Sequence, residues 1–300
     1  MIGNGSSFRR SSHVVGMYSQ TGSTSSILLK RSVSSVKRMA SHPTLAYYLT
    51  GSADGSLRMF EFGTPKPVSV LRQPGSGPGI TRIRFTPQGN KYGVTDISGK
   101  LCLWQGIQTY PKDAYQTLNQ SNTRCTISDF AFLGSSSIIV TCGDSVDNKN
   151  ISIWDTLMPS RNNIVKEFIC HEGGASAIAF SSNEQRLISG GRRGEISIFD
   201  MRQHRIVSNL TVHSAAVTRI VLNDTEGYFI TGSQDGEIKV WDLFTVSELT
   251  SIAGRHSKTR LFRPEGGVMD MIVDPDGCLY SCGADGTVKV HTLDLPYIAT

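Results

Sequence analysis

One form of segment recurs six times along the chain, and this recurrence constrains the fold more than any other feature. Each copy has an apolar run, a step of small residues, a turn, and then alternating apolar residues that end in a ring-bearing side chain. The copies are residues 49–60, 92–104, 140–154, 187–199, 229–241 and 279–291. Their last residues lie 44, 50, 45, 42 and 50 positions apart. These intervals are close to the ~40–45 residues of a four-stranded propeller blade.

The chemistry of each copy explains the hairpin inside it. An Asp-Gly pair or its equivalent supplies the positive φ angles of a tight turn. The alternation that follows, as in residues 237–241 (EIKVW), buries one face of a strand and exposes the other. A further apolar strand is predicted upstream of each copy, at residues 36–40, 80–85, 127–132, 175–180, 217–222 and 268–273. A fourth strand follows downstream, as at residues 205–212.

Four short antiparallel strands cannot bury both faces of their sheet alone, and radial stacking of blades solves this problem. We therefore predict an all-β propeller over residues 26–300, with six recognisable four-stranded blades and a seventh left open. Residues 1–25 are rich in Ser and Gly and are predicted to be flexible, with a strand only at residues 13–18. Residues 26–30 are predicted to complete the sixth blade as its outer strand, because a free edge strand invites aggregation.

Composition excludes several functional classes. No run approaches the roughly 18 apolar residues of a membrane-spanning helix, and no apolar core follows Arg9 and Arg10 as in a secretory signal. The six cysteines have neither paired spacing nor histidine partners for zinc, which predicts free thiols in a reducing compartment. The net charge of +5 permits an acidic partner without requiring nucleic acid. The sequence thus predicts a cytoplasmic protein with no cofactor and no membrane insertion.

Three short motifs at the ends of the copies resemble the WD-repeat family. They are residues 240–242 (VWD), 153–155 (IWD) and 198–200 (IFD), and the resemblance covers residues 26–293. It implies a hydrogen-bonded structural tetrad of His, Ser or Thr, Asp and Trp, which the fifth repeat matches with His213, Thr231, Asp235 and Trp241. A buried indole N–H needs an acceptor and a buried carboxylate needs donors, so such a tetrad is physically reasonable.

The other repeats depart from the tetrad. The fourth has His171 and Ser189, but Arg193 stands in place of Asp and Phe199 in place of Trp. The sixth has His256, Ser281 and Asp285, with His291 in the Trp position. The first and second repeats lack the histidine. These departures leave the predicted fold intact but predict blades of unequal stability.

A closer resemblance runs over most of residues 30–292. Residues 31–39 (RSVSSVKRM), 49–56, 128–132 (SDFAF), 153–157 (IWDTL) and 281–287 (SCGADGT) are similar to the C-terminal propeller of DmX-like proteins, the rabconnectin alpha subunits. These relatives are very large, which implies that the chain corresponds to their C-terminal end or to a fragment. Membership implies a role in a complex that promotes assembly of the vacuolar-type proton pump (V-ATPase) and organelle acidification.

The sequence offers no catalytic or metal motif. It has no Gly-x-Ser-x-Gly elbow, P-loop or His-Glu-x-x-His, and the repeat itself explains the position of His213. The acidic segment 144–150 lacks the Gly and the distal Glu of a calcium loop, so a solvated loop is favoured over a metal site. We expect a structural role for these residues and no enzyme activity.

A basic surface is the candidate partner site. Arg192 and Arg193 replace the usual acidic turn of the fourth repeat, while Arg255, Lys258 and Arg260 lie in the linker into the sixth. The turn between the second and third strands of a blade and the linker from one blade to the next open on the same face of a propeller. These residues could therefore form a rim that receives an acidic partner. The alternative, that they are ordinary solvated charges, is favoured because mild basic clusters are common on protein surfaces.

Three functions follow from these observations. The leading one is an interaction scaffold that binds V-ATPase peripheral-sector subunits or other rabconnectin-complex subunits, and reaches endolysosomal or vesicle membranes through those partners. The alternative is a generic WD-repeat adaptor, such as the substrate receptor of a ubiquitin ligase. A hydrolase with a site at the axial mouth is the rival from another class. The apolar and small residues expected on the innermost strands, as in residues 175–180 (ASAIAF), argue against it.

Overall fold

The structure is a computed structural model. It describes residues 16–17, 26–27, 35–72, 79–106, 116–118, 126–134, 137–159, 162–252, 256, 266–274 and 277–293. Every regular element in these ranges is a β-strand, which confirms the predicted all-β class. The chain divides into two units, residues 1–97 with 102–115 and residues 98–101 with 116–300.

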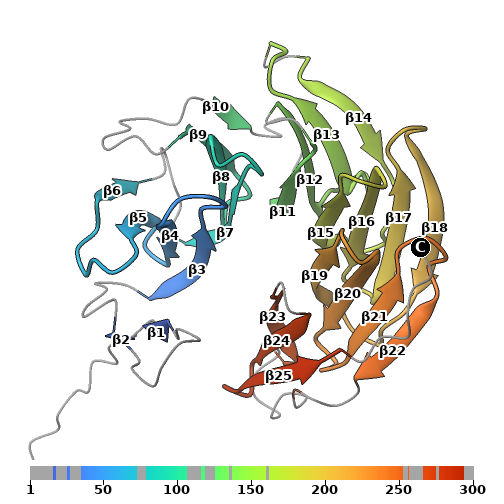
Figure 1. Ribbon diagram of the computed structural model, residues 1–300. Coiled ribbons are helices and arrows are strands. Elements are labelled where there is room, and N and C mark those ends of the chain that lie inside the picture. The colour runs from blue at the N-terminus through green and yellow to red at the C-terminus, as the bar shows by residue number, and fades with distance from the viewer. Residues whose placement is uncertain are drawn as a thin grey trace, which may run out of the picture. The chain divides into compact units, whose positions relative to one another are not determined.

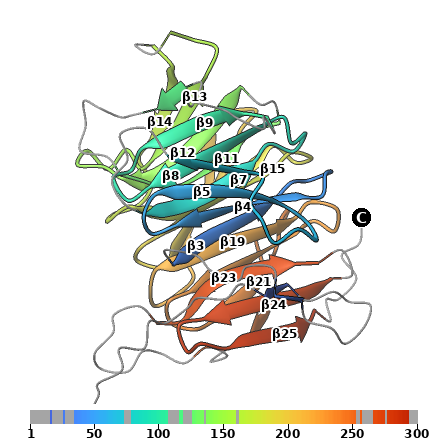
Figure 2. The same ribbon diagram turned by 90° about the vertical axis from the view of Figure 1, so that its left-hand side faces the viewer.

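The first two blades account for most of the first unit. The first sheet contains β3 (Val36–Ser41), β4 (Tyr47–Ser52), β5 (Ser56–Glu61) and β6 (Ser69–Arg72), in that order. Figure 2 shows β3, β4 and β5 side by side. The second sheet contains β7 (Ile80–Phe85), β8 (Lys91–Asp96), β9 (Leu101–Gln105) and the short β10 (Gln116–Leu118). Each is an antiparallel meander, as the hairpin pattern predicts.

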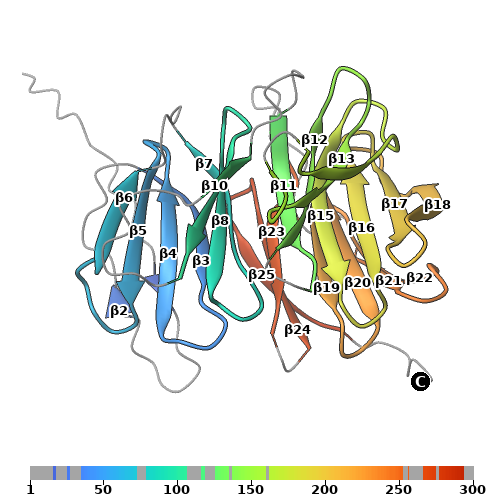
Figure 3. The same cartoon turned by 90° about the horizontal axis from the view of Figure 1, so that it is seen from above.

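The other four blades belong to the second unit (Figures 1 and 3). The third contains β11 (Thr126–Phe132), β12 (Ile138–Asp144), β13 (Ile151–Asp155) and β14 (Ile164–Phe168). The fourth contains β15 (Ala175–Ser181), β16 (Arg186–Gly191), β17 (Glu195–Asp200) and β18 (Arg205–Thr211). The fifth contains β19 (Val217–Asn223), β20 (Tyr228–Ser233), β21 (Ile238–Asp242) and β22 (Glu248–Ile252). The sixth has three described strands, β23 (Val268–Val273), β24 (Cys278–Gly283) and β25 (Val288–Thr292).

The first strand of every blade begins within one residue of its predicted start. The six repeats therefore correspond to six blades in the described chain. In each first strand the pairing register shifts after the first or second residue, so one residue forms a β-bulge. The bulged residues Ser176 and Thr218 carry hydroxyl groups. These lie 2.5 Å from the Val217 carbonyl oxygen and 2.6 Å from the Val268 carbonyl oxygen, each on the next blade.

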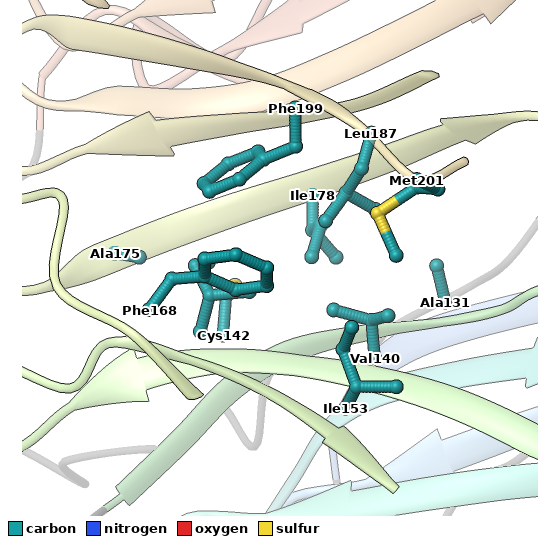
Figure 4. Packing of buried hydrophobic residues seen from close by; sticks show 11 residues of the cluster. Ala131, Val140, Cys142, Ile153, Phe168, Ala175, Ile178, Leu187, Phe199 and Met201 are labelled. Atoms are coloured by element: carbon teal, nitrogen blue, oxygen red, sulfur yellow. The ribbon is translucent and has the colours of Figure 1, made fainter. Parts of the chain in front are cut away.

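Apolar clusters join consecutive blades. One cluster combines Val140 and Ile153 of the third blade with Ile178, Leu187 and Phe199 of the fourth (Figure 4). Equivalent clusters join the first blade to the second, the fourth to the fifth and the fifth to the sixth. Because each sheet buries both faces only through its neighbours, the stacked arrangement expected from the repeat holds within each unit.

The predicted closure of the sixth blade is wrong where the structure describes it. β2 (Ser26–Ile27) pairs with β1 (Gly16–Met17) in a two-stranded sheet, and not with β25. Pairing two nearby segments closes a far shorter loop than pairing residue 26 with residue 290, so it costs less chain entropy. Residues 28–30 lie outside the described residues. β1 does fall within residues 13–18, as expected, and the domain boundary at residue 26 stays a prediction.

Candidate functional site

The four tetrad residues of the fifth blade meet inside the sheet. His213 lies in the connection before β19, Thr231 in β20, Asp235 in the β20–β21 turn and Trp241 in β21. The Trp241 indole N–H donates to Thr231 Oγ1 at 3.0 Å, and Thr231 Oγ1 lies 2.8 Å from His213 Nε2. All four side chains are buried. These bonds link β21 to β20 and β20 to the connection before β19, so the group ties this connection to the sheet.

Burial sets the charges in this group. It lowers the pKa of His213 to about 4, so the imidazole is neutral at pH 7. Burial alone would raise the pKa of Asp235, but the backbone N–H groups of Glu237 and Ser214 donate to its carboxylate and hold the pKa below its usual value. His213 Nδ1 lies 3.6 Å from Asp235 Oδ2, which is longer than a hydrogen bond. This contact is therefore an electrostatic one between an imidazole N–H and a carboxylate.

A metal ion is the obvious alternative occupant, because ligand atoms of His213, Asp235 and Glu237 all lie within 4.8 Å of one another. The Asp235 carboxylate, however, already accepts hydrogen bonds from the Ser214 N–H, the Ser214 hydroxyl and the Glu237 N–H. Its lone pairs are thus directed to donors of the turn and of the connection before β19. The geometry favours the hydrogen-bonded structural role that the sequence predicts.

The fourth blade builds the same group from a residue that the sequence pattern did not reveal. His171 Nε2 lies 2.7 Å from Ser189 Oγ, as the repeat implies. The acid is Glu195, whose Oε1 lies 3.4 Å from His171 Nδ1, whereas Arg193 points to solvent. Glu195 is equivalent to Glu237 of the fifth blade, two residues after the expected acid, and this register is the signal that could have revealed it. Phe199 fills the Trp position and packs on Phe168 with ring centroids 5.0 Å apart.

The sixth blade has a histidine at each end of the group. His256 lies 3.1 Å from Asp285 through Nδ1 and 2.9 Å from Ser281 Oγ through Nε2. His291 Nε2 lies 3.3 Å from the same serine oxygen, in the place of the indole. The residues that the resemblance assigned to this blade are therefore brought together.

The second and third blades keep only part of the group. In the third, the Trp154 N–H donates to Thr141 Oγ1 at 2.8 Å. In the second, Trp104 is fully buried, but its N–H has no hydrogen-bond acceptor among the described residues. Val94 stands where the fifth blade has Thr231, since Tyr92 stacks on Trp104 as Phe229 stacks on Trp241. The missing hydroxyl explains the unpaired indole.

The basic rim is only partly described, because Arg255, Lys258 and Arg260 lie outside the described residues. Arg192 and Arg193 form the turn between β16 and β17. Arg192 pairs with Asp144 at 2.5 Å and Arg193 with Glu172 at 2.5 Å. Asp144 belongs to the segment considered for calcium, and here it binds an arginine. Each of the two arginines therefore has a carboxylate beside it at the surface.

A charged group on the innermost strands was not expected from the sequence. Arg219 Nε lies 2.8 Å from Asp270 Oδ1, and Arg219 Nη1 lies 4.0 Å from Asp129 Oδ2. The three residues come from the third, fifth and sixth blades, each at the position where pairing resumes after the bulge. Asp129 is fully buried and also accepts a hydrogen bond from the Phe130 N–H. The expectation of mainly apolar inner strands was incomplete, and the group binds three blades to one another.

Comparisons with known proteins agree with this architecture. The family described as WD domain, G-beta repeat matches residues 162–200, 204–242 and 256–292. DmX-like protein 1 is 43% identical in Mus musculus and 41% identical in Homo sapiens, each over 91% of the chain. The chain spans 9% of the length of these relatives.

Solved structures are similar in fold. A structure of Chaetomium thermophilum Sqt1 bound to the N-terminus of ribosomal protein L10 has a TM-score of 0.72 at 17% identity and covers 93% of the chain and 77% of that protein. The computationally designed Ika8 protein has a TM-score of 0.65 at 21% identity and covers 88% of the chain and 73% of its own. No helix among the described residues is long and apolar enough to cross a membrane. With its six blades and its matches to the WD repeat, the chain has the fold of a WD-repeat β-propeller and resembles DmX-like protein 1.

Proposed function

We propose that the chain acts as the propeller of a DmX-like subunit in a complex that promotes V-ATPase assembly and organelle acidification. The observation that carries this proposal is the identity of 43% over 91% of the chain to DmX-like protein 1. A WD-repeat propeller is in general a non-catalytic scaffold for protein partners, and each tetrad described above has a structural role within its own blade. The expected partners are peripheral-sector subunits of the pump and other rabconnectin-complex subunits. Through them the chain would reach endolysosomal or vesicle membranes from the cytoplasm.

The test is affinity purification of the full chain from cell lysate, with measurement of organelle pH after the protein is depleted. Recovery of pump subunits together with raised organelle pH supports the proposal. Recovery of ubiquitin-ligase adaptors with normal organelle pH contradicts it and favours the adaptor alternative. Recovery of neither group, with normal organelle pH, also contradicts it.

The rim of Arg192, Arg193, Arg255, Lys258 and Arg260 remains a proposed partner surface. Because Asp144 and Glu172 already pair with the first two arginines, an acidic partner would have to displace these carboxylates. The same purification with Arg192→Glu and Arg193→Glu together tests the rim. Reduced recovery of a partner, more marked at low salt than at high salt, supports it. Unchanged recovery contradicts it.

A further inference from the structure

The turns between the third and fourth strands of three consecutive blades share one construction. Each begins with an aspartate whose carboxylate accepts the backbone N–H two residues later. Asp155 binds the Leu157 N–H at 2.9 Å, Asp200 the Arg202 N–H at 2.8 Å, and Asp242 the Phe244 N–H at 2.7 Å. Such side-chain capping fixes the turn backbone. The residue two positions after each aspartate is therefore held in a defined orientation.

The first residue after the aspartate packs inward in two of these turns. Met201 joins the core cluster shared by the third and fourth blades, and Leu243 joins the one shared by the fourth and fifth. The following side chain then lies in solvent. Leu157 is 78% exposed, Phe244 is 50% exposed, and Arg202 between them is exposed. Met158, beside Leu157, is 47% exposed.

Phe244 is anchored although half of it is open to solvent. A side chain on Gly227 would come within 3.1 Å of its ring, so the ring lies against the glycine backbone. The Leu243 N–H donates to the Gly227 carbonyl at 2.8 Å, and the Arg186 guanidinium donates to the Phe244 carbonyl at 3.0 Å. A rigid, half-exposed aromatic side chain loses little entropy on binding, which is typical of residues that dominate interface energies.

Unpaired positive charge lies between the apolar side chains. Arg202, within the β17–β18 turn, and Arg205, the first residue of β18, are both exposed. Within the described chain, neither has a carboxylate within ion-pair distance, in contrast to Arg192 and Arg193 on the opposite end of the sheet. A partner carboxylate could therefore bind them without displacing an existing pair.

We propose that Leu157, Met158, Arg202, Arg205 and Phe244, here called the turn surface, dock an acidic peptide segment that carries apolar side chains on both sides of its acidic residues. The inference rests on the scaffold role of the propeller and is independent of the proton pump. The apolar groups are separated by the cationic turn of the fourth blade, which suits an extended segment that spans three blades. The acidic Glu184 and Glu226 stand in the neighbouring turns. A narrow peptide can place its acidic residues on the two arginines and away from these glutamates, whereas a flat anionic membrane would face all of them.

The test selects binders to the full chain from a display library of random linear peptides. Selected peptides are measured against three variants of the turn surface, Phe244→Ala, Leu157→Ala and the double variant Arg202→Glu with Arg205→Glu. Matched controls are Ile169→Ala and Arg72→Glu, since both side chains are exposed and lie at the end of the fourth strand of their sheets, away from the turn before that strand. Vesicles of anionic lipid form a separate arm.

The expected result is enrichment of acidic, apolar peptides whose affinity falls about tenfold with each variant of the turn surface and stays unchanged with the controls. The effect of the double arginine variant is expected to be smaller at high salt. Peptides that bind all variants equally, peptides that carry net positive charge, or no enrichment at all would overturn the proposal. Vesicle binding that Phe244→Ala abolishes, without peptide binding, would also overturn it. None of these outcomes depends on pump subunits, so the two proposals can fail separately.

Discussion

Glu195 Oε1 lies 3.4 Å from Nδ1 of His171, in a blade whose expected acid is replaced by arginine. The longer glutamate side chain reaches from two residues further along the turn to the position that a shorter aspartate fills in other blades. The group therefore depends on where the carboxylate is placed and not on which residue supplies it. This relationship leads to the first prediction.

Glu195→Gln should destabilise the fourth blade by about 1 kcal/mol, because an amide cannot supply the charge that faces the His171 N–H. The free energy of unfolding in urea measures the change. Glu172→Gln is the matched control, since Glu172 is exposed and binds an exposed arginine. Equal stability of Glu195→Gln and the wild type would show that the carboxylate has no structural role.

Trp241→Ala should cost about 3–5 kcal/mol, because it empties the site of a large buried ring and removes the donor to Thr231. Trp241→Phe should cost less, since Phe199 fills the equivalent site of the fourth blade without an indole N–H. Urea unfolding of both variants gives the comparison. A Trp241→Ala variant with the wild-type unfolding midpoint would contradict the assigned role of the tetrad.

Val94→Thr should stabilise the second blade by up to about 1 kcal/mol. The two side chains have nearly the same shape, and the new hydroxyl would accept a hydrogen bond from the buried Trp104 N–H. Thermal unfolding measures the gain, with Val94→Ala as the cavity-forming control that should destabilise. Destabilisation by Val94→Thr as large as that by the control would mean that the indole does not reach this position.

Stability should fall as the pH falls from about 6.5 to about 4, in part because of His213. Burial depresses the pKa of the folded imidazole to about 4, while the unfolded one titrates near 6.5. The unfolded state therefore binds the proton first, and the contribution of His213 is complete above pH 6.5 and lost as the pH approaches 4. The contribution amounts to about 3 kcal/mol. Urea unfolding of wild type and His213→Gln over this pH range isolates it, because the variant should lack this part of the slope. Parallel slopes would contradict the depressed pKa.

Arg219→Met should destabilise the second unit by about 3 kcal/mol, because it leaves the buried Asp129 carboxylate and Asp270 without their shared cation. Combining Arg219→Met with Asp129→Asn should recover part of this loss, since the amide can still accept from the Phe130 N–H. A double-mutant cycle measured by urea unfolding gives the coupling energy. Strictly additive losses would show that the two side chains do not interact.

The sequence predicts those parts of the molecule that repeat. Asp-Gly turns and alternating apolar residues act locally, so the strands around Val217 and Trp241 could be located without a structure. The group centred on Arg219 could not, because its three members lie 51 to 141 residues apart and meet only through the bulge register. The pairing of Ser26 could not be predicted for the opposite reason. Its partner strand lies nearby in the sequence but has no strong hydrophobic pattern, and it competes with the distant edge of the sixth blade for pairing with Ser26. The role of Glu195 was not predicted because its longer side chain reaches His171 from two residues beyond the position where the repeat has its acid.

The hydroxyl groups of Ser176 and Thr218 have a consequence for engineering. Each bonds a carbonyl group of the following repeat, so half of the interaction is encoded in one repeat and half in the next. A chimera that replaced a single repeat by one from another propeller would still offer a backbone carbonyl to the preceding repeat. It would lose the bond to the following repeat unless the donor also carried Ser or Thr at the bulge. The first strands of two consecutive repeats should therefore be transferred together. Recombination points are best placed in the outer strands of the blades.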